Sequence, residues 1–121
     1  GGMYNMAQDQ NNINNFALLQ KAITSSRQYT PKQRDILNLF LNIEVNDLVQ
    51  ITPLELTESL NTSRATVYLG LSRLEEDGLI QNLSQKGRHF NVYRLNKTKL
   101  NDFLTVYQKK QSFLKKTDKF T

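Results

Sequence analysis

The side chains that carry most protein chemistry are scarce in this chain. It has no cysteine and one histidine, His89, which excludes thiolate chemistry and multi-histidine metal sites. No nucleophile paired with a general base and no glycine-rich phosphate loop is visible along the chain. The sequence therefore predicts a protein that is not an enzyme and that has no metal or cofactor.

Basic side chains are the main candidates that remain. Sixteen lysine and arginine residues outnumber eleven aspartate and glutamate residues, and the excess is unevenly spread. Residues 79–121 hold ten basic and two acidic residues, whereas residues 31–78 hold four and eight. A surface of one sign usually meets a polyanion, either nucleic acid or an anionic membrane. The same lysines would also suit a solvated helix face, so the order of the elements must decide.

Apolar stretches are too short for a membrane span. The longest, Phe16–Leu19, has four residues, far below the roughly 18 that a span requires. The first residues lack the regions of a signal peptide, so a cytoplasmic location without membrane contact is expected. Gly1 and Gly2 before Met3 are typical of the remnant of an expression tag.

The length of 121 residues suits one compact domain with tails. Residues 1–12 are rich in amides and are predicted to be disordered, and residues 117–121 are predicted to be a second flexible tail. The single domain between them spans residues 13–116. It begins with a short helix from Ile13, with apolar residues at helical spacing, that ends near Thr24.

Two threonine–proline pairs predict the starts of the next two helices. Thr30 caps a helix that begins with the following proline, and Thr52 caps a short helix over residues 53–60. In each case a glutamine or glutamate three residues after the cap completes a capping box. Residues 42–50, between these helices, break the apolar pattern, and no element is predicted for them.

A third helix follows a tight turn at Asn61 and Thr62. Ser63 caps this helix, and Gly78 ends it as a left-handed C-cap. Its buried face is predicted from three apolar residues at helical spacing: Val67, Leu71 and Leu74.

After this glycine the periodicity becomes that of β structure. Residues 79–83 are apolar, residues 84–88 are typical of a turn, and residues 89–95 alternate, which together predict a β-hairpin. Asn96 then caps a long helix with an apolar stripe on one side and lysines on the other. The stripe consists of Leu100, Phe103, Leu104, Tyr107 and Leu114.

This order of elements resembles the winged helix-turn-helix domains of small prokaryotic transcription regulators in the broad MarR, ArsR and PadR-like group. The motifs are ITPLELTESLNTSRATVYLGLSRLEEDGLI at residues 51–80 and GRHFNVYRLN at residues 87–96. The resemblance covers residues 31–96, the predicted core of the domain. It implies a mainly α-helical fold with a small β-hairpin and additional N- and C-terminal helices.

The resemblance implies a sequence-specific protein for double-stranded DNA that acts as a dimer, either a transcription regulator or a plasmid or phage replication or partition factor. The recognition helix, residues 63–77, would enter the major groove, and the wing, residues 84–91, would lie on the adjacent groove or backbone. The alternative is a winged-helix module that contacts another protein through its acidic core surface. A small molecule, if one binds, would sit between the terminal helices and the core.

A helix in the major groove needs polar and basic side chains at its N-terminal end, where free N–H groups also favour phosphate. Arg64 is predicted to contact guanine, and Thr66 or Ala65 a thymine methyl, whereas Tyr68 and Arg73 are better placed for phosphate. The predicted DNA-contacting residues are Asn61, Thr62, Ser63, Arg64, Thr66, Tyr68, Arg73, Lys86, Arg88 and His89.

Structural roles stay open for several of these residues. Ser63 caps its helix whether or not it meets a phosphate, and Arg73 has acidic residues three and four positions later, the spacing of an ion pair. Tyr68 could bury its ring, and His89 could be an ordinary strand residue. Leu69 stands where many relatives carry a basic residue, which predicts lower affinity per monomer.

The long C-terminal stripe exceeds what a domain of this size covers, so the terminal helices are predicted to form a homodimer. Such a dimer would set two recognition helices about 34 Å apart, for successive major grooves. The alternative is packing within one chain with a frayed lysine tail. The predicted interface consists of Phe16, Leu19, Ile23, Leu100, Phe103, Leu104, Tyr107 and Leu114.

Overall fold

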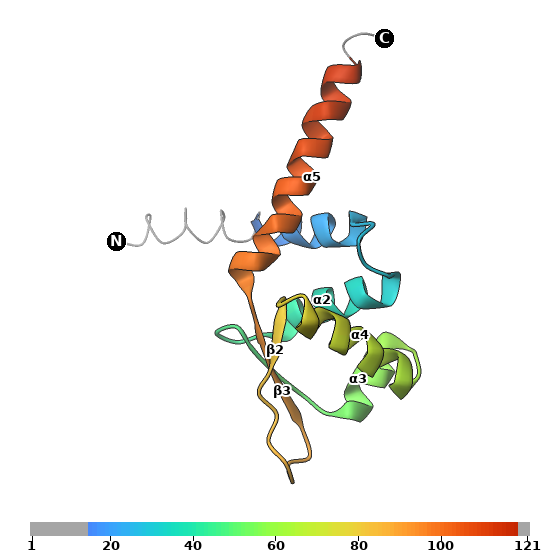
Figure 1. The fold of residues 1–121 in the computed structure, drawn as a ribbon, viewed down its shortest axis with the longest axis vertical. Coiled ribbons are helices and arrows are strands. Elements are labelled where there is room, and N and C mark those ends of the chain that lie inside the picture. Colours follow the sequence, from blue (N-terminus) through green and yellow to red (C-terminus); the bar gives the residue numbers. More distant parts are fainter. Residues whose placement is uncertain (1–14, 119–121) are drawn as a thin grey trace, which may run out of the picture.

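A computed structural model describes residues 15–118 (Figure 1). A helical segment at residues 15–25 is followed by α2 (Pro31–Ile43), β1 (Leu48–Ile51) and α3 (Pro53–Leu60). After these come α4 (Arg64–Glu76), β2 (Ile80–Asn82), β3 (Asn91–Leu95) and α5 (Lys97–Asp118). The predicted winged helix-turn-helix with terminal helices is confirmed. The predicted tail at residues 1–12 lies outside the described residues.

The C-terminal boundary differs from the prediction. α5 continues through Asp118, so the first two residues of the tail predicted at 117–121 are helical. The remaining three lie outside the described part of the chain. Within that part, no helix is long and apolar enough to cross a membrane.

Helices α2 and α3 begin at the predicted threonine–proline pairs. The Thr30 hydroxyl accepts a hydrogen bond from the Gln33 amide at 3.2 Å, and the Gln33 side-chain oxygen accepts one from the Thr30 amide at 3.0 Å. Thr52 and Glu55 form the same reciprocal pair, at 3.1 and 3.3 Å. These boxes satisfy amide groups that a helix start leaves without partners, so both starts are set locally.

The sheet of the described residues has three strands in the order β1–β3–β2, one more than the predicted hairpin. β1 pairs antiparallel with β3, with Val49 opposite Tyr93. The prediction that residues 42–50 form no element is therefore wrong, because β1 begins at Leu48. Asn46 and Asp47 both have positive φ, 52° and 69°, as in tight hairpin turns, and they turn the chain from α2 into β1. The break in the apolar pattern is the turn before a strand.

The core lies between α2, α4, the sheet and the first turns of α5. The rings of Phe40 and Tyr93 stack at its centre, 5.3 Å apart. The three α4 residues predicted to face inward are buried as expected: Val67, Leu71 and Leu74.

Part of the predicted dimer interface belongs to this core. Four of its residues are at most 9% exposed within a single chain: Leu19, Ile23, Leu100 and Phe103. A single chain already covers these four side chains, because they belong to the core that α2, the helical segment at 15–25 and the start of α5 share.

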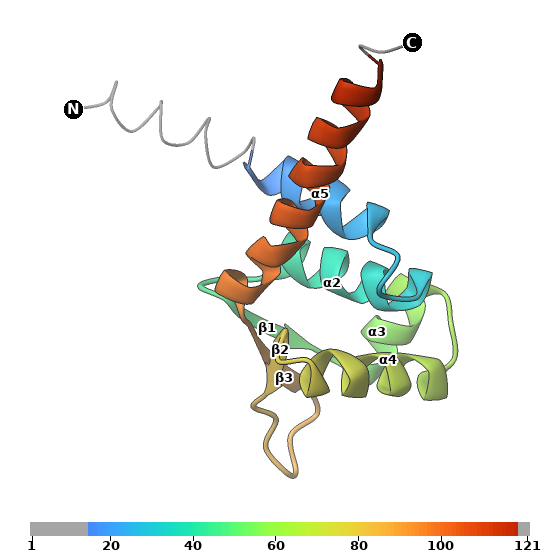
Figure 2. The same ribbon diagram turned by 45° about the horizontal axis from the view of Figure 1, so that its top comes forward.

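The second half of α5 projects from the domain, at the opposite end from the wing loop (Figures 1 and 2). Leu104 and Tyr107 are half-buried against the core. Leu114 is 54% exposed and Phe16 37%. Intrachain packing, the alternative to a dimer, therefore accounts for the first half of the stripe and not for its end.

Asn96 joins the end of α4 to the start of α5. Its side-chain oxygen accepts a hydrogen bond from the Lys99 amide at 3.1 Å, which is the predicted cap of α5. Its side-chain nitrogen donates to the carbonyl of Gly78 at 3.2 Å, and its main-chain N–H donates to the carbonyl of Leu79 at 2.9 Å. Gly78 itself has φ 76°, the left-handed conformation predicted for the end of α4.

Candidate nucleic-acid interface

The turn between α3 and α4 builds the N-terminal end of α4. Asn61 ends α3 in the left-handed conformation, with φ 49°. The Ser63 hydroxyl accepts a hydrogen bond from the Thr66 amide at 3.2 Å and donates one to the Thr66 hydroxyl at 2.9 Å. Ser63 is therefore the predicted cap. Its hydroxyl proton is used in the hydrogen bond to Thr66, whereas the Thr66 hydroxyl keeps its own proton for donation.

Arg64 and Tyr68 form a cluster with the wing side of the sheet. The Arg64 guanidinium lies 5.7 Å from the centroid of the Tyr68 ring. The Tyr68 hydroxyl accepts a hydrogen bond from the side-chain nitrogen of Asn91, at the start of β3, at 3.0 Å. The Tyr68 ring is half-buried against the core, as its structural alternative predicts, whereas Arg64 is exposed.

Close packing on α2 sets the rotation of α4. A Cβ atom on Gly70 would lie 2.8 Å from Cδ1 of Ile36, a distance that real Cβ atoms do not reach. Glycine therefore lets the end of the Ile36 side chain pack directly on the α4 backbone, and a larger residue here would require Ile36 to move. With this side inward, the outermost residues of α4 are those predicted: Ala65, Leu69 and Ser72.

The wing is the loop of residues 83–90 between β2 and β3. The Ser84 hydroxyl accepts a hydrogen bond from the Val92 amide at 3.0 Å and closes the base of the loop. Gly87 has φ 81° at the tip. Figure 2 shows the wing and α4 on the same side of the molecule, away from the far end of α5. The exposed polar side chains of the tip are Gln85, Lys86, Arg88 and His89.

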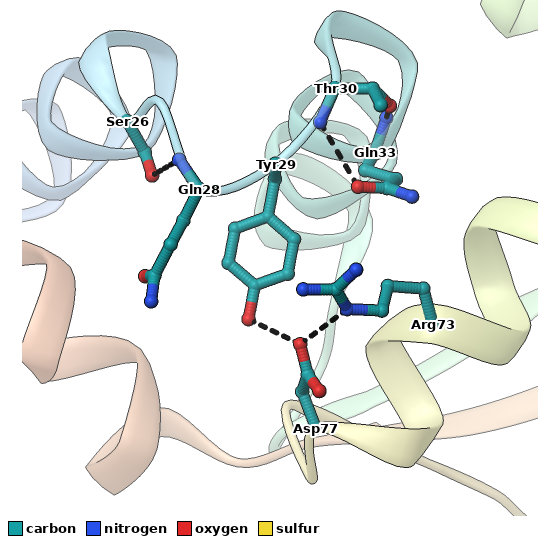
Figure 3. Close-up of polar contacts among 7 residues, drawn as sticks. All are labelled: Ser26, Gln28, Tyr29, Thr30, Gln33, Arg73 and Asp77. Atoms are coloured by element: carbon teal, nitrogen blue, oxygen red, sulfur yellow. Dashed lines mark hydrogen bonds and ion pairs between the residues drawn. The ribbon is translucent and has the colours of Figure 1, made fainter.

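Arg73 lies on the opposite flank of α4 and is engaged within the chain (Figure 3). Its Nε donates to Oδ2 of Asp77 at 2.9 Å, and its guanidinium lies 5.4 Å from the centroid of the Tyr29 ring. The Tyr29 hydroxyl donates to the same Oδ2 at 2.7 Å. For Arg73 the structure favours the ion pair, one of its two predicted roles, over DNA contact.

These contacts shift the protonation of all three groups. Burial raises the pKa of Tyr29 to about 12, and its hydrogen bond to Asp77 acts in the same direction. The hydrogen bonds from Arg73 and Tyr29 lower the pKa of the Asp77 carboxyl. The hydrogen bond to Asp77 raises the pKa of Arg73. At neutral pH the cluster is a carboxylate held between a cation and a neutral phenol.

A cavity of about 550 Å³ adjoins this cluster. Its walls are the helical segment 15–25 with the residues after it, the C-terminal end of α4 and the first half of α5. It lies between the terminal helices and the core, where the sequence predicts that a small molecule would sit. Sequence reasoning missed Tyr29 because its contact with Asp77 joins residues 48 positions apart. No group of three potential metal ligands occurs among residues 15–118.

The structure brings the predicted DNA-contacting residues into two groups and leaves one aside. The N-terminal end of α4 and the wing tip share one side of the fold, whereas Arg73 faces the junction with α5. The first group consists of Asn61, Thr62, Ser63, Arg64, Thr66 and Tyr68, and the second of Lys86, Arg88 and His89.

Comparison with known proteins supports the fold. No protein-family model and no curated protein matches the chain. The solved S. aureus MepR–DNA complex matches with 14% identity and a TM-score of 0.52, over 99% of this chain and 90% of that chain. The transcriptional regulator Tm0710 from Thermotoga maritima matches with 17% identity and a TM-score of 0.51, over 100% and 82%. This chain thus has the winged helix fold that its resemblance to MarR-type regulators predicts.

Proposed function

We propose that this protein is a transcription regulator that binds double-stranded DNA sequence-specifically, with α4 in the major groove and the wing on the adjacent groove or backbone. The observation that carries the proposal is that exposed Arg64 lies at the N-terminal end of α4, whereas exposed Lys86 and Arg88 lie on the wing, on the same side of the fold as α4. Helix N-termini and basic side chains are the groups that hold a duplex backbone and read its bases. The similar fold in the MepR–DNA complex agrees with this function.

The acidic residues at the C-terminal end of α4 do not oppose this arrangement. Asp77 is paired with Arg73. Glu76, at the last position of α4, is twelve residues from Arg64, which is about 18 Å along a helix. A phosphate beside the N-terminal end of α4 is therefore remote from the acidic end of the same helix.

Selection of bound fragments from random duplex DNA tests the proposal. We expect an enriched motif, and we expect the Arg64→Ala variant to lose enrichment while its circular dichroism stays unchanged. Sites recovered upstream of genes would support transcription regulation, whereas sites at a replication origin would favour a replication or partition role. Recovery of no enriched motif would contradict sequence-specific binding and favour the protein-interaction module.

We further propose that the protein acts as a homodimer formed through the projecting half of α5. Leu114 is 54% exposed there, Val106 is 54% exposed near the middle of α5, and Phe16 is exposed on the neighbouring helical segment. A two-fold contact would cover these side chains, and it would place two copies of α4 about 34 Å apart for successive major grooves. This surface is smaller than the sequence predicts, because the buried half of the stripe takes no part.

Light scattering at micromolar concentration tests the dimer. The wild type is expected to have the mass of two chains, and the double variant Val106→Lys, Leu114→Lys that of one. Leu54→Lys is the matched control, because Leu54 is a 65% exposed leucine on α3, away from α5. A wild type with the mass of one chain would refute the dimer and the expectation of a palindromic site.

A further inference from the structure

The outermost side chain of α4 is a leucine. Leu69 is 73% exposed, more than any other large apolar side chain in the described residues. A helix turns about 100° per residue, so Leu69 points roughly opposite to Val67 and Leu71, which are buried in the core. The outermost side chain of the helix proposed to enter the major groove is therefore apolar.

The fold holds Leu69 in this direction. Gly70, the next residue, is packed so closely against Ile36 that a Cβ atom there would displace the end of the Ile36 side chain. A rotation of α4 that buried Leu69 would move Gly70 off Ile36 and expose Val67. The exposed position of Leu69 is thus a consequence of tight packing on the other side of the helix.

The side chains around Leu69 offer few hydrogen-bonding groups. Ala65 and Ser72 are its exposed neighbours on one side. On the other side the Thr66 hydroxyl accepts a hydrogen bond from the Ser63 hydroxyl, and Arg73 is paired with Asp77. The centre of the α4 surface is therefore mostly apolar, in contrast to its N-terminal end at Arg64.

In the major groove one common base edge matches such a surface. Thymine presents a methyl group on C5 beside its O4 acceptor, and this methyl is the groove's apolar feature. Guanine, adenine and cytosine present hydrogen-bonding groups there, which a leucine would cover without replacing the displaced water. An apolar side chain at the centre of the helix thus favours a C5-methyl pyrimidine.

We infer that Leu69 is a specificity-determining residue that recognises the C5 methyl group of a pyrimidine in each half-site. The inference rests on the proposed function and adds the chemical group that the centre of α4 reads. Arg64 then supplies the hydrogen bonds at one end of α4, and Leu69 supplies an apolar contact one and a half turns later. Thymine and 5-methylcytosine share this methyl group, and the test separates them.

Replacing thymine by deoxyuridine removes this methyl group and leaves the hydrogen-bonding edge unchanged. Each thymine of a selected duplex is replaced in turn, and binding is measured by fluorescence anisotropy. For the wild type we expect about three- to tenfold weaker binding at one or two positions per half-site, the loss for about one buried methyl group. A parallel series carries cytosine or 5-methylcytosine at those positions. If 5-methylcytosine restores the binding that cytosine loses, the protein reads the methyl group alone. If it does not, the protein also requires thymine O4 in addition to the methyl contact.

Variants assign the effect to Leu69. Leu69→Ala should bind the thymine duplex as weakly as the wild type binds the uracil duplex, and should no longer distinguish the two. Leu69→Met should keep most of the discrimination. Ser72→Ala, a change on the same exposed surface, is the matched control and should keep all of it.

The outcomes separate the inference from the function on which it rests. Tight binding of the selected duplex with no position at which uracil weakens it more than twofold would overturn the inference alone. The same holds if Leu69→Ala retains the preference for thymine. Failure to bind any duplex would overturn the proposed function and the inference with it.

Discussion

The two ends of the molecule carry positive charge in different ways. At one end Arg64 lies at the capped start of α4, and Lys86 and Arg88 lie in the turn of the wing hairpin. At the other end Lys109 and Lys110 lie on the projecting part of α5 (Figure 1). The excess of basic residues after residue 79 is thus divided between opposite ends of the fold. The charge count identifies a basic segment of the sequence. Only the fold shows which of its basic residues lie on the same side and could contact one DNA duplex.

The largest expected effect concerns α5, whose first half is packed in the core and whose second half projects from it. Leu100→Ala should lower the free energy of unfolding by about 2–5 kcal/mol, because Leu100 is fully buried in the core of one chain. Leu114→Ala should act only through the concentration dependence of unfolding, because Leu114 is exposed. Urea denaturation at several protein concentrations measures both. Equal losses at all concentrations would mean that the far half of α5 is also packed within one chain.

The next effect concerns specificity at the α4 end. Arg64→Ala should weaken binding to a selected duplex by about 1–3 kcal/mol and leave binding to a scrambled duplex nearly unchanged. The reason is that the variant can no longer hydrogen-bond a base edge, while the groups that bind phosphate stay in place. Anisotropy titrations on both duplexes give the comparison. An equal loss on the two would show that Arg64 contacts phosphate.

A charge-matched pair of variants compares the two ends directly. Lys86→Ala with Arg88→Ala should weaken binding to every duplex and reduce the slope of log K against log salt by about 0.9 for each phosphate that is no longer neutralised. Lys109→Ala with Lys110→Ala removes the same charge from α5 and should leave the slope unchanged. Salt titrations of both variants are the measurement. An equal reduction of the slope in both double variants would show that net charge, rather than its position, determines DNA binding.

The smallest expected effect lies at the junction between the two ends. Tyr29→Phe should lower the free energy of unfolding by about 0.5–1.5 kcal/mol at neutral pH, because the variant cannot donate the hydrogen bond to Asp77.

The pH dependence gives this variant a second readout. Folding raises the pKa of Tyr29 from 10.0 to about 12, so its contribution is fully present below pH 10 and is lost as the pH rises towards 12. Tyr93, whose pKa burial also raises to about 12, adds a loss common to both proteins. The variant should therefore lose less stability than the wild type between pH 10 and 12. Parallel denaturation curves over this range would contradict the role assigned to Tyr29.

Features with a local cause could be predicted from the sequence. The starts of α2 and α3 depend on a threonine, a proline and one side chain three residues later, all within one turn. The cap at Ser63, the end of α4 at Gly78 and the start of α5 at Asn96 are equally local. The position of Arg64 at the free end of α4 follows from these boundaries.

Features that depend on distant partners could not be predicted in this way. β1 has four residues, too few for a clear alternation, and it is stabilised by pairing with β3, 40 to 46 positions later. The role of Arg73 stayed open between Asp77 and DNA, because Tyr29, which joins the cluster, is remote in sequence. The burial of Leu100 in the core is also non-local, so the sequence left open how much of the α5 stripe is covered within one chain.

Asn96 and the core contacts of the first half of α5 fix the direction in which its second half projects. α5 has 22 residues, so its second half is about 16 Å long, and a tilt of about 10° where the packed half ends would move the far end by about 3 Å. In the proposed dimer the far ends meet, and such a tilt would change the separation of the two recognition helices by an amount close to the roughly 3.4 Å step between successive base pairs. The packing of the first half of α5 on the core would then set the spacing of half-sites that the protein accepts.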